Sequence, residues 1–171
     1  MNRLLLPAIY LALILSSCKK KNDIVPINTI SATINGVQID FHTAVNAIYS
    51  DSSKKISLFG FAGLGSKSPI ININISANNL ITVGTYESGI GSAFALANPN
   101  IIYSDTGAGE DPAYIFVTDA SGSHPSIVNI TSISSFNVQG TFRGVVARQG
   151  NQFATITNGK FNVNIQPSPM P

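Results

Sequence analysis

Residues 30–41 read ISATINGVQIDF, and this stretch decides the fold of the chain. Apolar and polar residues alternate along both of its halves, which is the pattern of a strand with one buried face and one wet face. Asn35-Gly36 separates the halves, and this dipeptide suits a two-residue hairpin turn because both turn positions need φ > 0. The stretch therefore predicts an antiparallel β-hairpin.

The period of two continues to residue 165, and no window of the body has the 3.6-residue apolar spacing of a helix. Turns rich in Gly, Asn, Asp and Ser recur about every 8–12 residues, which is typical of a sandwich or barrel. We expect an all-β domain, an antiparallel β-sandwich or partly open barrel. Asn158-Gly159 either separates the last two strands or marks a bulge within one long strand. The further strands are expected at 44–49, 55–62, 71–77, 81–86, 93–97, 101–104, 114–119, 126–134, 137–148, 152–157 and 160–165.

The polar surface carries few charges. Charged residues make up 11% of the 171-residue chain, against about 25% in an average soluble domain, whereas Asn, Ser and Thr number 17, 20 and 11. This composition excludes a charged coiled coil and a charged disordered tail, and the single Cys excludes a disulfide-stapled mini-protein. From Ile24 onward six Lys and Arg stand against seven Asp and Glu, so we expect no nucleic-acid partner.

The first 17 residues have the layout of a secretory signal peptide, with Arg3 ahead of an uncharged apolar run over 4–15 that is too short to span a bilayer. The run ends in Leu15-Ser16-Ser17-Cys18, which resembles the lipobox of bacterial lipoproteins. The resemblance implies cleavage before Cys18, a thioether-linked diacylglycerol on its sulfur, and an N-acyl chain such as palmitate. The alternative is an ordinary signal peptide followed by a free or buried thiol.

Four segments follow from these boundaries: a signal peptide (1–17), a lipidated Cys with a linker (18–28), a β-domain (29–165) and a Pro-rich tail (166–171). The tail carries three Pro and is not expected to extend a central strand. Lys19–Lys21 either contact anionic headgroups or form a solvated tether. Surface-exported lipoproteins of the resembled kind often carry an acidic run after the Cys, so the three Lys favour the periplasmic face of the outer membrane.

Four short patterns recur in this order: Ile34-Asn35-Gly36, Gly84-Thr85-Tyr86, Gly140-Thr141-Phe142 and 156–161, ITNGKF. Together they resemble a family of Bacteroidetes-type lipoproteins with a lipobox and a β-rich domain of unknown function. The resemblance covers about residues 28–165 and implies the compartment and the fold. The family usually has a Trp shortly after the Asn-Gly turn, where this chain has Phe41. No catalytic or binding residue follows from it.

Candidate chemistry is sparse. His42 and His124 lie far apart in the sequence, outside any metal-ligand spacing, and both fall at expected turns. Neither a nucleophile elbow nor a phosphate-binding loop is present, so we predict that the protein is not an enzyme and needs no cofactor. One loop is a candidate calcium site because Asp105, Glu110 and Asp111 surround two Gly and supply hard oxygen ligands. A solvated acidic turn is the alternative.

The expected function is a membrane-anchored envelope lipoprotein that binds or displays something, with a protein or a glycan as its ligand. An accessory subunit of an envelope assembly, using a sandwich edge as its interface, is the runner-up. A small envelope hydrolase is the third interpretation. Loops held by the scaffold are the expected place for a ligand, and residues 88–112 and 120–125 are the two stretches that break the short-turn rhythm. Asn72 and Asn74 form either a ligand-facing ladder or a solvated strand face.

Overall fold

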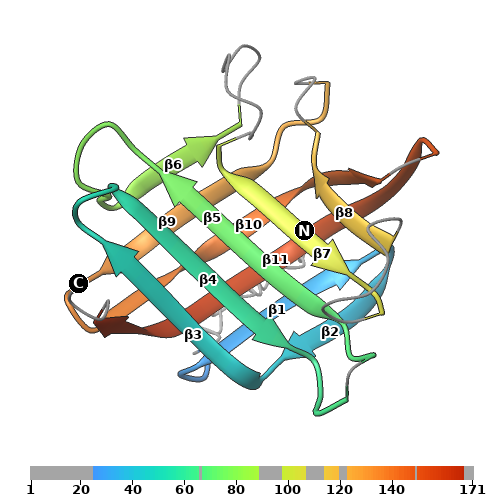
Figure 1. Cartoon of the computed structure of the whole chain (residues 1–171), viewed down its shortest axis with the longest axis horizontal. Coiled ribbons are helices and arrows are strands. Elements are labelled where there is room, and N and C mark those ends of the chain that lie inside the picture. Colours follow the sequence, from blue (N-terminus) through green and yellow to red (C-terminus); the bar gives the residue numbers. More distant parts are fainter. Residues whose placement is uncertain are drawn as a thin grey trace, which may run out of the picture.

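The computed structural model describes residues 25–65, 67–88, 98–106, 114–119, 123–148 and 150–167. These residues form eleven β-strands and no α-helix, which confirms the all-β prediction (Figure 1). No helix in the described ranges is long and apolar enough to cross a membrane. The strands are β1 (Thr29–Ile34), β2 (Val37–Phe41), β3 (Thr43–Ser50), β4 (Lys55–Phe61), β5 (Ile70–Ser76), β6 (Gly84–Glu87), β7 (Asn100–Ser104), β8 (Ile115–Thr118), β9 (Ile127–Ile133), β10 (Asn137–Arg148) and β11 (Gln152–Pro167).

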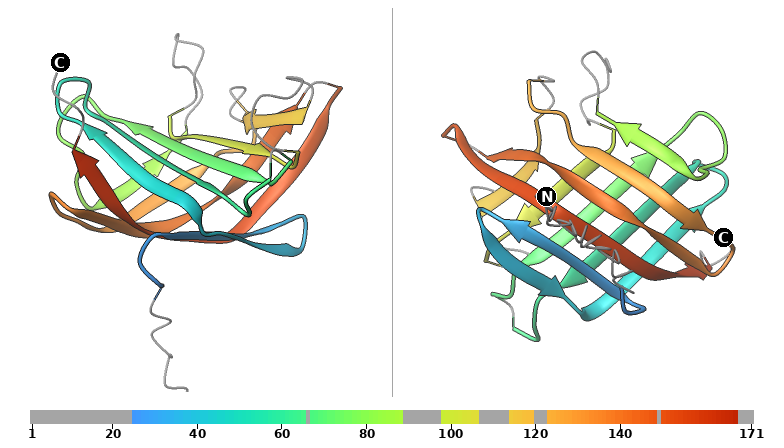
Figure 2. Two further views of the ribbon diagram at one scale, coloured as in Figure 1. Left: turned by 60° about the horizontal axis from the view of Figure 1, so that its bottom comes forward. Right: turned by 180° about the vertical axis from the view of Figure 1, so that it is seen from behind.

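The strands lie in two layers whose directions cross in projection (Figures 1 and 2). One layer holds β3, β4, β5, β7 and β8, and the other holds β6, β9, β10, β11, β1 and β2. The long strands β10 and β11 belong to the second layer, but their ends reach the first: β10 pairs with β8 and β11 pairs with β3. The hydrogen-bonded path β3–β4–β5–β7–β8–β10–β11 therefore returns to β3. The β1–β2 hairpin is attached to β11, and β9 with β6 is attached to β10.

The pairing that closes this path corrects two expectations. Ile165, Gln166 and Pro167 pair with Ala47, Ile48 and Tyr49 in parallel, so the sheet is mixed rather than purely antiparallel. The tail also contributes two residues to the last strand. Pro is tolerated there because it stands at the end of the strand, where its missing N–H removes no interior ladder bond.

The expected strands agree with the structure with few exceptions. The hairpin of residues 30–41 is confirmed, with Ile34 opposite Val37 and with φ of 49° at Asn35 and 84° at Gly36. The strand expected at 81–86 begins only at Gly84, and the one expected at 93–97 lies outside the described residues. Residues 152–165 belong to one strand, so of the two alternatives at Asn158-Gly159 the bulge is correct.

The bulge is visible in the register of β11 against both of its neighbours. Ser31 and Thr33 of β1 are opposite Lys160 and Thr157, so β11 carries one extra residue there, and the β10 pairing shifts at the same place. Asn158 has a φ of 53° within this segment. A bulge bends its strand and re-aims the neighbouring side chains, and here it lies in the middle of the second layer.

The core fills the space between the layers with alternate residues of nearly every strand. Its largest fully buried side chains are Phe41, Phe161, Ile30, Ile56, Leu58, Ile71, Ile73, Ile75, Ile101, Ile130, Ile156 and Val128. Because alternate residues face inward, the intervening residues of each strand are held on the outer faces. The core thus fixes which side chains the outer surface presents.

Two Gly-x-Phe segments hold the centre of the second layer. Gly140 of β10 is opposite Phe161 of β11, and Phe142 is opposite Gly159. The two rings lie 6.4 Å apart between centroids, and each fills the space above the glycine of the other strand. The middle residues, Thr141 and Lys160, are therefore opposite one another and point away from the core.

Candidate functional site

A row of polar residues crosses the outer face of the second layer. We call this outer face the tether face. Successive register partners across all six strands bring these residues side by side, although they come from distant parts of the sequence. The row contains Asp40 (β2), Ser31 (β1), Lys160 (β11), Thr141 (β10), Asn129 (β9) and Thr85 (β6). The Oγ1 of Thr85 donates a hydrogen bond to Oδ1 of Asn129 at 3.2 Å.

A hollow of about 610 Å³ opens on this face beside the β11 bulge, and we call it the Arg143 hollow. Its volume lies within the range of about 300–1,000 Å³ that is usual for small-molecule sites. Side chains and backbone from four strands surround it. The lining residues are Thr85, Glu87, Ile127, Asn129, Thr141, Phe142, Arg143, Asn158, Gly159 and Lys160.

The Arg143 hollow contains opposite charges on either side of an apolar residue. Glu87 of β6 and Arg143 of β10 are both register partners of Ile127 of β9, on opposite sides of it. Two strand spacings separate their backbones by roughly 10 Å, and no ion pair joins these two exposed side chains in the structure. The hollow therefore offers a carboxylate acceptor and a guanidinium donor together with amides and hydroxyls.

The beginning of the described chain is bound to the same face. The Nδ2 of Asn162 donates to the carbonyl oxygen of Val25 at 2.8 Å, and the backbone N–H of Asn164 donates to Oδ1 of Asn28 at 2.9 Å. Thr29 Oγ1 donates to the carbonyl oxygen of Pro26 at 2.6 Å. These contacts place residues 25–29 over β11, so the chain enters the domain from the tether face.

Two smaller hollows lie on either side of Val25, which lines both. One, of about 390 Å³, is lined by Val25, Thr131, Gln139, Gly140, Thr141, Lys160, Phe161 and Asn162. The other, of about 420 Å³, is lined by Val25, Pro26, Thr29, Ser31, Asp40, His42 and Lys160. His42 adjoins the end of β2, as the sequence predicts, and its Nδ1 lies 3.1 Å from the carbonyl oxygen of Asp40. Lys160 lines all three hollows.

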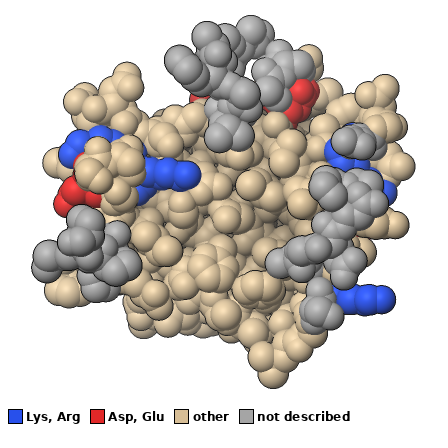
Figure 3. Space-filling model, viewed as in Figure 1, with Lys and Arg blue, Asp and Glu red and all other residues tan. Residues whose placement is uncertain are grey.

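The outer face of the first layer differs in character. In Figure 3 its charged side chains gather toward the rim, and its centre is uncharged. Asn74 accepts a hydrogen bond from Ser57 Oγ at 2.7 Å and donates one to Oδ1 of Asn72 at 2.8 Å. The partly buried rings of Phe59 and Phe61 pack edge to face beside this network. The amides of Asn72 and Asn74 are thus bonded to one another along the strand, and neither alternative for these two residues, a ligand-facing ladder or a solvated face, is decided by this contact.

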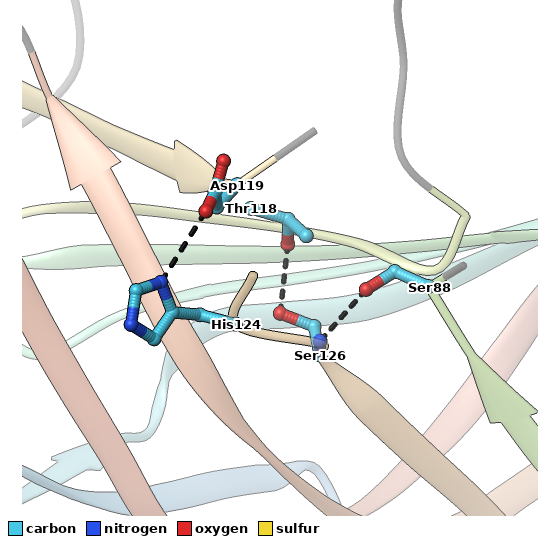
Figure 4. Close-up of polar contacts among 5 residues, drawn as sticks. All are labelled: Ser88, Thr118, Asp119, His124 and Ser126. Carbon is cyan, nitrogen blue, oxygen red and sulfur yellow. Dashed lines mark hydrogen bonds and ion pairs between the residues drawn. The ribbon is translucent and has the colours of Figure 1, made fainter. Parts of the chain in front are cut away.

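The structure brings a His, an Asp and a Ser together without forming a nucleophile–base pair (Figure 4). The Nδ1 of His124 lies 3.3 Å from Oδ2 of Asp119. Ser126 is fully buried, and its Oγ lies 3.0 Å from Thr118 Oγ1, while its N–H donates to Ser88 Oγ at 2.7 Å. The second imidazole nitrogen of His124 points away from Ser126 in Figure 4. Ser88, Thr118 and Ser126 therefore link β6, β8 and β9 rather than forming a hydrolase triad.

The predicted calcium loop is only partly described. Asp105 is exposed at the end of β7, whereas Glu110 and Asp111 lie outside the described residues. No group of three potential metal ligands occurs within the described ranges. Burial, and secondarily the Asp105 carboxylate, raises the pKa of Tyr103 to about 12. Cys18 also lies outside the described part of the chain.

The sequence favours the loops as the place for a ligand, and no motif in it singles out Glu87, Arg143 or Lys160. The sequence signal that could locate this site is the repeated Gly-x-Phe pattern. When two such segments pair on adjacent strands, each Phe ring can lie over the Gly of the other segment, as Phe161 does over Gly140. The residues between them then occupy the centre of the opposite face. The pairing of the two segments could not be read from the sequence.

No family model, no curated protein and no solved structure matches this chain.

Proposed function

We propose that this chain is a lipid-anchored protein of the cell envelope that binds a ligand without catalysing a reaction, and that the ligand occupies the Arg143 hollow. The observation that carries the binding role is the hollow itself. The two paired Gly-x-Phe segments and the β11 bulge lie beside it, and hydrogen-bond donors and acceptors from four strands surround it. Such convergent polar groups are typical of a binding site. In the cluster of Figure 4, Ser126 Oγ lies against Thr118 Oγ1 and His124 lies against Asp119, so this cluster gives the hydrolase interpretation no support.

The anchor is proposed from the Leu15–Cys18 segment and the apolar run before it. Diacylglycerol and an N-acyl chain on Cys18 would attach the protein stably, because two or more acyl chains suffice where one is marginal. The Lys run after Cys18 favours the periplasmic face of the outer membrane. The resemblance to Bacteroidetes-type lipoproteins supports the cell envelope as the compartment.

The test of this function is an envelope binding assay with the acylated full chain. Solubilised envelope extract is passed over the immobilised protein, with Arg143→Gln as the test variant and Lys67→Gln as the control, since Lys67 is exposed and does not line the hollow. We expect retention of a component by the wild type and the control, and its loss from the Arg143 variant. Equal retention by all three proteins would contradict the site.

The accessory-subunit interpretation has a separate observation in its favour. The uncharged centre of the first layer exposes part of Phe59 and Phe61, and β2 and β6 are the terminal strands of the sheet order. Unpaired strand edges are templates for pairing with another chain. A protein component retained independently of Arg143 but lost on Phe59→Ser would support that function instead.

A further inference from the structure

We propose that the Arg143 hollow binds a saccharide, and that this saccharide is carried by the membrane that holds the anchor. The inference rests on the proposed function and names the class and the location of its ligand.

The chemistry of the hollow favours a saccharide over a simple ion. Glu87 would repel a phosphate or carboxylate ligand, while Arg143 and Lys160 would repel a metal cation. A saccharide instead needs both acceptors and donors, because each hydroxyl donates one hydrogen bond and accepts others. Glu87 accepts, Arg143 donates, and the amides of Asn129 and Asn158 do both.

The shape of the hollow agrees with this class. Ile127 lies between Glu87 and Arg143 in register, so an apolar patch is flanked by the two charged groups. The C–H face of a pyranose ring can pack on such a patch while its hydroxyls reach the polar groups around it. Thr141 is fixed at the other side by the Gly140–Phe161 and Phe142–Gly159 pairs, which hold β10 against β11.

The entry point of the chain determines which way the hollow faces. Val25 lies on the tether face and lines a hollow together with Thr141 and Lys160, both of which also line the Arg143 hollow. Val25 lies seven positions after Cys18, and a fully extended segment of seven residue steps spans at most about 25 Å. A lipid on Cys18 therefore keeps the tether face near the bilayer and turns the uncharged face away from it. A saccharide headgroup of the same membrane is within reach.

The experiment uses the acylated full chain in vesicles of phosphatidylethanolamine and phosphatidylglycerol, with and without glycosyl diacylglycerols bearing a hexose or an N-acetylhexosamine. The same sugars are offered free to protein in sugar-free vesicles. Saturation-transfer NMR reports the contact between sugar and protein. Glu87→Gln and Arg143→Gln are compared with Asp51→Asn and Lys67→Gln, exposed residues that do not line the hollow.

We expect at least one sugar to bind in both forms, and about tenfold or greater weakening in the two hollow variants, as for loss of a hydrogen bond to a charged group. The two controls should bind as the wild type does. If the sugar still contacts the protein in both the Glu87→Gln and the Arg143→Gln variants, the hollow is not the binding site. Contact with free sugar but none with the vesicle-borne form overturns the membrane source. If no sugar binds while envelope extract is still retained through Arg143, the ligand class is wrong and the proposed function stands.

Discussion

Gly140 of β10 and Phe161 of β11 are cross-strand partners in contact so close that a Cβ on Gly140 would lie 2.5 Å from Cζ of the ring. The same Cβ would lie 2.2 Å from the carbonyl oxygen of Asn129 on the other neighbouring strand. The relationship is reciprocal, since a Cβ on Gly159 would lie 2.7 Å from the ring of Phe142. These two pairs bring β10 and β11 together under the Arg143 hollow.

The Gly140→Ala variant should be destabilised by overpacking. Its methyl group has to displace a backbone carbonyl as well as a ring, and such strain costs about 1–3 kcal/mol. The free energy of unfolding is measured by urea titration. Gly65→Ala is the control because its Cβ would have its nearest contact at an ordinary 3.5 Å, and we expect its change to stay within about 0.5 kcal/mol. Equal stability of the two variants would contradict the packing described here.

The Gly36→Val variant tests the hairpin that decides the fold. Gly36 has a φ of 84°, and no atom lies within 4 Å of where its Cβ would be, so strain comes from the backbone alone. We expect a loss of about 1–3 kcal/mol. Gly36→Asn should lose much less, because Asn tolerates positive φ. If urea titration shows the same loss in the free energy of unfolding for both variants, the positive φ at residue 36 does not determine which residues are tolerated there.

Such local features are the part of the fold that the sequence predicts. Asn35-Gly36 and the alternation of Ile30, Ala32 and Ile34 specify a hairpin from nearest-neighbour chemistry alone. The parallel pairing of Ile165 with Ala47 depends instead on how two strands distant in sequence meet at a corner of the sandwich. Turn residues carry no information about such a meeting, and the Pro-rich composition at the C-terminus argued against it.

The candidate site escaped prediction for a related reason. Glu87, Ile127 and Arg143 are separated by 40 and 16 positions in the sequence and become neighbours only through strand register. Each is unremarkable in its own segment, as an ordinary residue on a wet strand face. The acidic loop around Asp105 is a candidate site in the sequence because its carboxylates are close in sequence, which is the only proximity that a single sequence displays.

Stability should fall at alkaline pH through Tyr103. Its folded pKa is raised to about 12, chiefly by burial, above the ordinary value of 10.0. Between these values the unfolded chain loses the phenolic proton while the folded chain keeps it, so the unfolded state gains stability as pH rises. Urea titrations at pH 9–11 should show a steeper decline for the wild type than for Tyr103→Phe. Parallel pH profiles for the two proteins would show that Tyr103 titrates normally. Asp105→Asn should reduce the decline slightly, because its charge is the second cause of the shift.

The anchor is tested on the N-terminus of the mature protein. Mass spectrometry should find Cys18 as the first residue, carrying a diacylglycerol and an N-acyl chain. Cys18→Ala should release the protein from membranes or leave an unprocessed precursor, while Ser17→Ala, which keeps a small residue before the Cys, should be processed normally. A mature chain that begins elsewhere and has a free thiol is the result that excludes the lipid anchor.

The most direct test of the whole account is hydrogen–deuterium exchange of the acylated full chain with and without solubilised envelope extract. A ligand in the Arg143 hollow should slow amide exchange in peptides covering 84–88, 127–131, 140–144 and 156–160. Peptides from β4 and β5, on the opposite layer, should exchange as before. Protection confined to β4 and β5 would place the binding surface on the uncharged face, and unchanged exchange throughout would contradict a binding role.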